Sequence, residues 1–410
     1  MIPGLSTFML IFRSLRHRNY RLFFAGQSIS LMGTWIQNIA LGWLVYRLTG
    51  SAIYLGVIAF AGQIPSLFIT PLAGVYADRF NRRITLLITQ SLAMLTSIAL
   101  AIMVLTGIAE IWVLMVMAVI AGVINAFDTP FRHAFVLELV VAREDLSNAI
   151  ALNSSLYNTA RFIGPLIGGL LISLVGEGWC FMINGISFSA AIISLLIIKV
   201  LKFEPAKQTG SLFRQLKDGL SYSWDYKPAR HLLLLIAVCG FVGLPFQALM
   251  PAFASDVLNG GAALLGTLTG SLGAGALTGA LYLASRQRMN ALPINIFIAS
   301  LMFAAALALF SQSQVILLSM IALYITGFGM IVMFNATNAL LQAISDEDKR
   351  GRVISLYSLT FMGMTPLGNL LAGFIAEYSS VAQTVLIASA ICLITGLLLR
   401  QKITRIRELV

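Results

Sequence analysis

The stretch Gly74-Val75-Tyr76-Ala77-Asp78-Arg79-Phe80-Asn81-Arg82-Arg83 is a short charged segment between two long apolar runs. An apolar run of about 20 residues can cross a bilayer as a helix, so the charges between two such runs must emerge at a membrane face. Asn81 tolerates a left-handed backbone conformation, which suits a tight turn. The stretch therefore predicts two membrane-spanning helices joined by a short basic loop with one aspartate at its start.

Apolar runs of this kind recur along the whole chain. Of its 410 residues, 59% are hydrophobic and only 10% are charged, and the mean hydropathy is +0.90. A soluble domain does not combine so much apolar surface with so few charges, so the bilayer is the natural solvent. We expect an all-α integral membrane protein with twelve transmembrane helices and no sizeable soluble domain. These helices should begin near Leu22, Tyr54, Ile84, Ile111, Leu146, Gly178, His231, Ala263, Pro293, Gln314, Arg352 and Ala382.

The formal net charge of +11 reflects how Lys and Arg are distributed between the loops. If the amino terminus is inside, 25 of the 27 Lys and Arg fall in the first 21 residues, in every second loop or in the carboxyl tail. Arg47 is then external and Arg161 lies within a span. Loops rich in Lys and Arg stay in the cytoplasm. We therefore expect a multi-pass protein of the cytoplasmic (inner) membrane with both termini cytoplasmic, and the basic charge predicts no nucleic-acid binding.

One long polar stretch, residues 199–230, divides the chain. Within it Phe213, Leu216, Leu220 and Trp224 fall on one helical stripe, which predicts an amphipathic helix on the inner membrane surface. We therefore predict an amino-terminal six-helix bundle (residues 1–200), a cytoplasmic linker with this helix (201–230) and a carboxyl-terminal six-helix bundle (231–410).

An internal repeat supports two pseudo-symmetric halves. Asp145 and Pro165 correspond, at an offset of 201 residues, to Asp346 and Pro366. Two six-helix halves related by an axis along the membrane normal are the expected architecture. The eighth helix has the spacing of small residues that is typical of closely packed helices, at Gly266, Gly270, Gly275 and Gly279.

Charged side chains inside a membrane are costly and mark functional sites by default. Asp128 and Arg132 are four residues apart and can pair on one helix face, although Pro130 disturbs the turn between them. Arg161 either meets an anionic substrate or balances the charge of Asp128, and a purely structural pair is the alternative. Asp128, Arg132 and Arg161 are our candidates for coupling transport to an ion.

The stretch from Gly74 to Arg83 resembles the loop between the second and third helices of major facilitator transporters, with Tyr76 and Asn81 in place of the usual leucine and glycine. The opening of the chain (residues 15–35) is similar to the start of the branch that holds drug exporters, macrolide exporters and enterobactin-type siderophore exporters. Residues 161–169 resemble the antiporter motif of exporting members, at Gly164, Pro165, Gly168 and Gly169. Glycine-rich packing without a transport direction is the alternative for that motif.

The resemblance implies a latch that closes the cytoplasmic side, with Asp78 facing the amino-terminal end of the eleventh helix and Asp128 binding Arg82. An anion is favoured at a helix amino terminus by roughly 0.3–1 kcal/mol. The arginine that drug/proton antiporters often carry in the fourth helix, four residues before a glycine, is absent here, because Ala118 precedes Gly122. This departure argues against the usual proton-coupling scheme of those antiporters. Few acids lie within the spans, and of these Asp128 is our candidate for proton coupling. The latch residues are Gly74, Asp78, Arg79, Arg82, Arg83 and Asp128.

In the same family the first, fourth, seventh and tenth helices line a central cavity. The resemblance therefore implies a cavity with amide, aromatic and methionine side chains, which suits a moderately large amphipathic solute. Simple packing is the alternative role for these residues. They are Gln27, Thr34, Asn38, Asn125, Phe246, Gln247, Met250, Tyr324, Met330 and Asn335.

We therefore expect a secondary active transporter that exports a drug-like compound or a siderophore by alternating access, with protons as the coupling ion. An importer or a metabolite or lipid carrier on the same scaffold is one alternative, and a non-transporting membrane protein is another. The sequence contains neither a nucleophile–base pair nor a phosphate-binding loop, so we do not expect an enzyme. The three cysteines are far apart in sequence, so we expect no metal site. We expect no cofactor, and a monomer.

Overall fold

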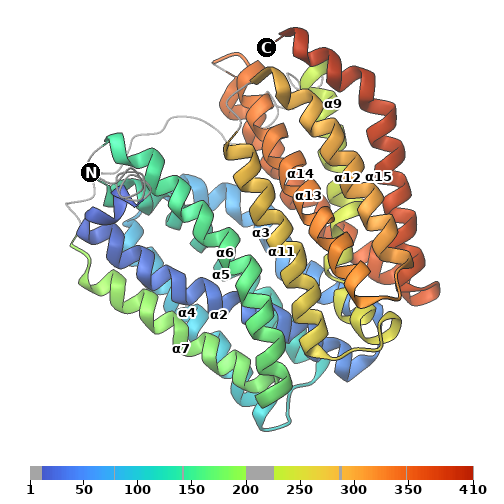
Figure 1. The fold of residues 1–410 in the computed structure, drawn as a ribbon. Helices are drawn as coiled ribbons and strands as arrows, with labels where there is room; N and C mark the ends of the chain where they lie inside the picture. The colour runs from blue at the N-terminus through green and yellow to red at the C-terminus, as the bar shows by residue number, and fades with distance from the viewer. Residues whose placement is uncertain are drawn as a thin grey trace, which may run out of the picture. The chain divides into compact units, whose positions relative to one another are not determined.

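The structure, a computed structural model, describes residues 12–77, 79–140, 143–199, 226–285, 289–347 and 349–409. These residues form helices and short connections, without a strand (Figure 1). Asp78 and most of the predicted amphipathic linker lie outside the described residues.

The predicted spans all coincide with helices, and each helix begins within a few residues of the predicted start. The first six are α2 (Arg18–Thr49), α3 (Ala52–Ala77), α4 (Arg82–Leu105), α5 (Ile111–Leu139), α6 (Arg143–Val175) and α7 (Glu177–Ile197). The last five are α11 (Ala262–Ala284), α12 (Leu292–Gln312), α13 (Ile316–Ile344), α14 (Arg350–Tyr378) and α15 (Val381–Thr404). A short 3₁₀ helix, η1 (Arg13–Arg16), precedes α2.

The seventh span is irregular. It starts as α9 (Lys227–Val238) and continues through a π-helical segment, Cys239–Gly243, and a 3₁₀ segment, Leu244–Gln247. After residue 249 it resumes as α10 (Met250–Ala252) and a second π-helical segment, Phe253–Val257. Pro245 and Pro251 lack the N–H that a regular helix needs, which accounts for two of these interruptions.

Eleven helices of the described chain are long and apolar enough to cross a membrane, counting Lys227–Gln247 as one. Helix α2 is not among these eleven, because its polar residues lower its hydropathy. Its 32 residues nevertheless extend about 48 Å, which is longer than the hydrocarbon core of a bilayer. The predicted all-α membrane fold is confirmed.

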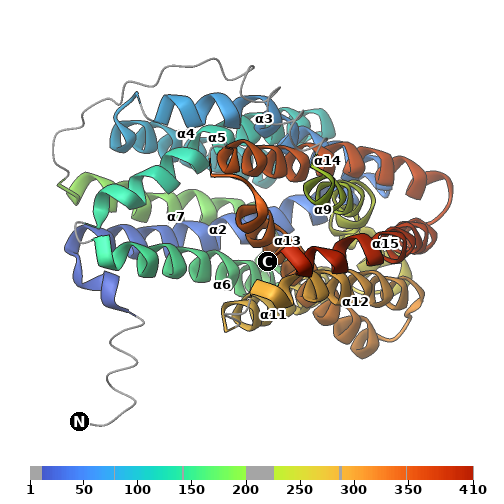
Figure 2. The same ribbon diagram turned by 90° about the horizontal axis from the view of Figure 1, so that it is seen from above.

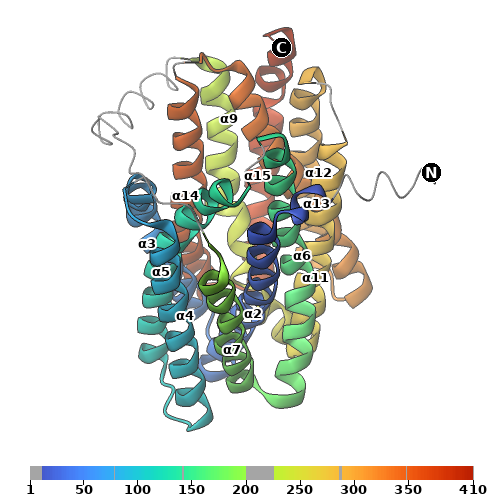
Figure 3. The same ribbon diagram turned by 90° about the vertical axis from the view of Figure 1, so that its left-hand side faces the viewer.

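Contacts between helices divide the chain into two units. Unit 1 comprises Met1–Leu44 and Ile64–Lys207, and unit 2 comprises Val45–Gln63 and Gln208–Val410. In unit 1, α4 packs along α7 and α5 (Figure 3). In unit 2, α13 packs against both α11 and α12, and α12 packs against α15 (Figure 2).

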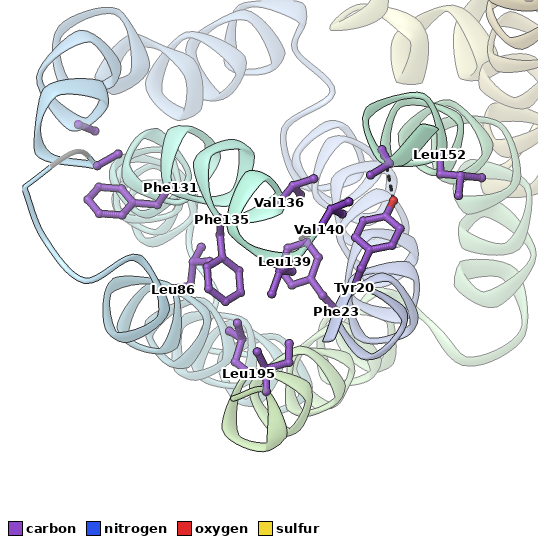
Figure 4. Packing of buried hydrophobic residues seen from close by; sticks show 14 residues of the cluster. Tyr20, Phe23, Leu86, Phe131, Phe135, Val136, Leu139, Val140, Leu152 and Leu195 are labelled. Carbon is purple, nitrogen blue, oxygen red and sulfur yellow. Dashed lines mark hydrogen bonds between the residues drawn. The ribbon is translucent and has the colours of Figure 1, made fainter. Parts of the chain in front are cut away.

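A cluster of buried hydrophobic residues in unit 1 lies at its predicted cytoplasmic end (Figure 4). Phe23 of α2 meets Phe135 of α5 edge to face, with ring centroids 5.6 Å apart. The hydroxyl of Tyr20 donates a hydrogen bond of 2.9 Å to the carbonyl of Ala149, so its polar end is satisfied in an apolar surrounding. This cluster ties α2, α4, α5, α6 and α7 together next to the predicted loop of the latch.

In unit 2 the helices α11 and α13 touch through their backbones. A Cβ on Gly275 would lie 1.8 Å from the carbonyl oxygen of Tyr324, and a Cβ on Gly327 would lie 2.0 Å from that of Leu272. No other residue fits at such a distance, so glycine permits the crossing. The predicted packing role of the eighth helix is confirmed at Gly275 and Gly279.

Candidate functional site

Asp128 in α5 is the centre of a buried polar network in unit 1. Its side chain is 5% exposed. Oδ1 accepts hydrogen bonds from the hydroxyl of Thr89 and from Nε2 of Gln90, each at 2.8 Å. Oδ2 pairs with Nη2 of Arg132 at 2.5 Å. The predicted i,i+4 pair of Asp128 and Arg132 is confirmed, and it stands within a regular helix despite Pro130.

The network extends from α5 through α4 to α2. The hydroxyl of Ser30 donates to Oε1 of Gln90 at 3.4 Å, which makes Gln90 a link between α2 and Asp128. Gln27 lies one turn before Ser30 and is 1% exposed, and its Nε2 has no hydrogen-bond partner among the described residues. A buried amide donor without an acceptor is costly, so Gln27 marks a place where a further polar group would be stabilised.

The first turn of α4, directly after the α3–α4 loop, contacts α5 and α7 through two arginines, Arg82 and Arg83. Arg82 donates from Nε to the carbonyl of Ala77 at 2.8 Å and from Nη1 to Oε1 of Glu138 at 2.7 Å. Our expectation that Asp128 binds Arg82 is therefore wrong: Asp128 is held by Arg132, and Glu138, nearer the end of α5, receives Arg82. Glu138 lies nearer than Asp128 to the end of α5 beside Arg82, so the Arg82 side chain reaches Glu138.

Two neighbouring residues cap helix ends: Arg83 caps the end of α7, and Asn81 caps the start of α4. Arg83 donates from Nε to the carbonyl of Leu195 at 2.6 Å and from Nη2 to that of Leu196 at 2.8 Å, at the carboxyl-terminal end of α7. A cation is favoured there by the helix dipole. The left-handed backbone expected for Asn81 is wrong: its φ is −63°, and its side chain accepts a hydrogen bond from the Ile84 N–H as the N-cap of α4.

The structure assigns no specific side-chain contact to the other predicted latch residues that it describes. Arg79 is exposed. A Cβ on Gly74 would meet no atom within 4 Å, so the structure gives no packing reason for glycine there. Asp78 lies outside the described residues.

Arg161 lies beside aromatic rings on unit 1. Its guanidinium carbon is 5.9 Å from the ring centroid of Trp35, a distance at which a cation is attracted to an aromatic face. Tyr157, one turn earlier on α6 and 49% exposed, meets Trp35 edge to face with centroids 6.0 Å apart. A cation and two aromatic rings therefore form one surface patch, which we call the Arg161 platform (Trp35, Tyr157 and Arg161).

The glycines of the antiporter-like motif bring α6 against α2. A Cβ on Gly164 would lie 2.4 Å from Cβ of Trp35, and a Cβ on Gly168 would lie 3.2 Å from Cα of Ile36. Pro165 and Gly169 are buried in the same helix. Gly164 thus has a packing role and also positions the indole on which Arg161 lies.

The predicted cavity residues divide into buried and exposed sets. Phe246, Met250 and Met330 are buried within unit 2, and Nε2 of Gln247 lies 3.8 Å from Sδ of Met330. Thr34 is half-buried. The exposed members are Asn38 and Asn125 of unit 1 and Tyr324 and Asn335 of unit 2. That the exposed amides and tyrosine line a cavity stays a prediction, whereas Phe246 and Met250 are buried in the irregular seventh span itself.

The role of Asp145 was missed in the sequence, where it served only to mark the repeat. Its buried carboxylate at the start of α6 is paired with Arg13, with Arg16 at 2.7 Å and with His17 at 2.8 Å. The hydroxyl of Ser14 donates to the carbonyl of Asp145 at 2.9 Å. The cluster of bases at residues 13–17 was the signal that an acid must face η1. Its counterpart in the repeat, Asp346, is 60% exposed and lies 3.7 Å from Lys349.

Comparison with known proteins identifies the family. A family model described as transmembrane secretion effector matches residues 11–409. The staphyloferrin A transporter of Staphylococcus aureus is 25% identical over 91% of this chain and 94% of that protein. The multidrug efflux pump Tap of Mycolicibacterium fortuitum is 26% identical over 92% and 93%. The solved structure of a POT family transporter in complex with 5-aminolevulinic acid has a TM-score of 0.71 at 12% identity, covering 94% of this chain and 97% of that one. The chain therefore belongs to the transmembrane secretion effector family and has the fold of major facilitator superfamily transporters.

Proposed function

We propose that the protein exports amphipathic small molecules by alternating access in exchange for protons. Membership of the transmembrane secretion effector family supports export. One relative is named as a multidrug efflux pump, and another as a staphyloferrin A transporter. Two six-helix halves, residues 1–200 and 231–410, would expose a midplane site to each side in turn. The distribution of Lys and Arg supports cytoplasmic termini.

The observation that carries proton coupling is the Asp128 network. A buried carboxylate that is paired with one arginine and accepts two neutral hydrogen bonds can gain or lose a proton with large local consequences. Protonation removes the charge that holds Arg132 and turns one acceptor oxygen into a donor. Gln90 passes this change to α2 through Ser30. The protonation of Asp128 is thereby linked to a helix that would line the substrate pathway.

The substrate class follows from half-buried and exposed side chains of unit 1. The Arg161 platform offers a cation and two aromatic faces, and Asn38 and Asn125 add exposed amides. Such a surface suits a solute with an apolar ring or chain and an anionic or polar group. We propose that Arg161 receives the anionic group of a substrate, while Trp35 and Tyr157 contact its apolar part.

At the predicted cytoplasmic end we propose that the α3–α4 loop belongs to a latch that closes the pathway. Arg82 and Arg83 hold this loop to α5 and α7, so it moves as part of unit 1. Asp78 would then be presented as an anion to the amino-terminal end of α14, as in the family that the loop resembles. Loss of this contact would open the cytoplasmic side.

The test of coupling uses protein reconstituted into liposomes with an imposed pH gradient, with the aromatic anion carboxyfluorescein and staphyloferrin A as the transported probes. The parent should move at least one of them against its gradient when the lumen is acidic. Asp128→Asn should reduce gradient-driven transport about tenfold or more, yet retain exchange of labelled for unlabelled probe.

Glu347→Gln is the matched control, because Glu347 is an exposed carboxylate of the described chain. It should transport like the parent. Full proton-driven transport by Asp128→Asn would refute the coupling role of Asp128. If the parent moves neither probe in response to the pH gradient, proton-driven export of this class is refuted.

A further inference from the structure

Basic side chains of unit 2 gather where its seventh and last spans lie side by side. Lys227, Arg230 and His231 belong to the beginning of α9, Lys402 lies in the last turn of α15, and the two helices pack together. Figures 1 and 3 show the start of α9 and the end of α15 at the same end of the unit. The charges of Lys402, Arg230 and Lys227 all act on the ring of His231. We call Lys227, Arg230, His231 and Lys402 the α9–α15 basic cluster.

The two lysines of this cluster have no acidic partner within the described part of the chain. Lys227 and Lys402 are both exposed, and neither forms an ion pair with a described residue. The bases of η1 differ in this respect, because they surround the buried carboxylate of Asp145. Like charges that lie close together repel one another. An anion placed between the start of α9 and the end of α15 would therefore be stabilised.

Exposed apolar side chains continue the same helix faces towards the middle of the spans. Leu234 lies two helical turns after Lys227 on α9 and is 40% exposed. Leu398 lies one turn before Lys402 on α15 and is 72% exposed. Ile394, one turn further along α15, is exposed as well. A ligand that fits this surface carries an anionic group at one end and hydrocarbon at the other.

The backbone that carries the cluster is fixed by packing. Ala229 and Leu232 of α9 and Ile403 of α15 are buried. The guanidinium carbon of Arg400 lies 5.5 Å from the ring centroid of Phe297, which ties the end of α15 to α12. Both helix ends are thus held in place before a ligand arrives, so binding orders side chains and not the backbone.

We propose that the α9–α15 basic cluster binds the phosphate of an anionic phospholipid, whose acyl chains lie along the exposed faces of α9 and α15. Lys and Arg near a membrane surface attract anionic headgroups, and basic pockets between membrane helices bind them. The bound headgroup would offset the repulsion within the cluster and hold the start of the irregular seventh span to α15. The proposal goes beyond proton-coupled export, since it concerns a membrane lipid and neither the transported solute nor the coupling ion.

Binding is tested with the full chain in a neutral detergent, without any transport measurement. The protein is titrated with dioleoylphosphatidylglycerol, and the affinity of the first bound lipid is measured by native mass spectrometry. Dioleoylphosphatidylcholine is the lipid without net charge, and glycerol 3-phosphate is the anion without acyl chains. The parent should bind phosphatidylglycerol about tenfold more tightly than either of the other two probes.

Combining Lys227→Gln with Lys402→Gln should weaken the binding of phosphatidylglycerol about 20- to 30-fold, because each cation contributes about fivefold near a membrane surface. Combining Lys227→Arg with Lys402→Arg keeps both charges and should bind within about twofold of the parent. Lys199→Gln is the matched control, because Lys199 is an exposed lysine at the predicted cytoplasmic end of unit 1. It should bind phosphatidylglycerol like the parent.

Binding of phosphatidylglycerol by the double glutamine variant at the parent's affinity would overturn the proposal. Equal affinity of the parent for glycerol 3-phosphate would identify a site for a soluble anion and refute the lipid. Equal affinity for phosphatidylcholine would refute recognition through charge, and so would equal losses in the arginine and glutamine variants. Both lysines are exposed, so the glutamine variant should fold like the parent, which its melting temperature without lipid verifies.

Discussion

Replacing Gly164 by alanine tests whether the antiporter-like motif is a packing element. The added Cβ would lie 2.4 Å from Cβ of Trp35, whereas carbon atoms in contact are about 3.5–4.0 Å apart. Cβ of Trp35 is fixed to its backbone, so α6 must move away from α2 by about 1 Å. Because Cβ of Trp35 cannot rotate away, this overpacking should cost about 2–3 kcal/mol, the upper part of the usual range. The better helix propensity of alanine offsets about 1 kcal/mol. We expect the free energy of unfolding to fall by about 1–2 kcal/mol.

Gly168→Ala is the graded comparison on the same helix face. Its Cβ would lie 3.2 Å from Cα of Ile36, which a shift of a few tenths of an ångström relieves. The strain and the gain in helix propensity then nearly cancel, so the free energy of unfolding should change by less than about 0.5 kcal/mol.

Thermal unfolding in detergent, followed by tryptophan fluorescence, measures both changes. Gly164→Ala should lower the melting temperature by roughly 1–2 °C and Gly168→Ala by less than about 1 °C, with Gly261→Ala as an unconstrained control. If Gly164→Ala unfolds like the parent but no longer exports, the packing explanation is refuted, and the motif acts in transport itself.

Three further substitutions test the remaining contacts. Asp145→Asn should lower the melting temperature more than Asp346→Asn, because Asp145 is buried among three bases whereas Asp346 is largely exposed; equal effects would contradict this account. Arg83→Gln should cost about 1 kcal/mol of unfolding free energy, since the last carbonyls of α7 lose a charged donor, and Arg83→Lys should restore part of it in the same measurement. Arg161→Gln should raise the KM of an anionic probe roughly tenfold and that of a neutral probe by less than about twofold, and a uniform rise would exclude the proposed contact with an anionic group.

The pairing of Asp128 with Arg132 was predictable because four residues place two side chains on one helix face. The partner of Arg82 was not, because Asp128 and Glu138 lie on the same helix and sequence alone does not show which of them is in reach. Asn81 illustrates a different difficulty. Asparagine suits both a left-handed turn and an N-cap, and the direction of α4 relative to the loop selected the cap.

The sequence by itself determined the order and length of the membrane helices and the family, since apolar run length, loop charge and short motifs are local properties of the chain. Only the tertiary structure decided which groups meet across 100 residues or more, such as Arg83 with the end of α7, Asp145 with η1 and Glu377 with the start of α3. A buried charge or an uncapped helix end requires a partner, but any element that packs beside it can supply one. The packing of the helices therefore makes the choice.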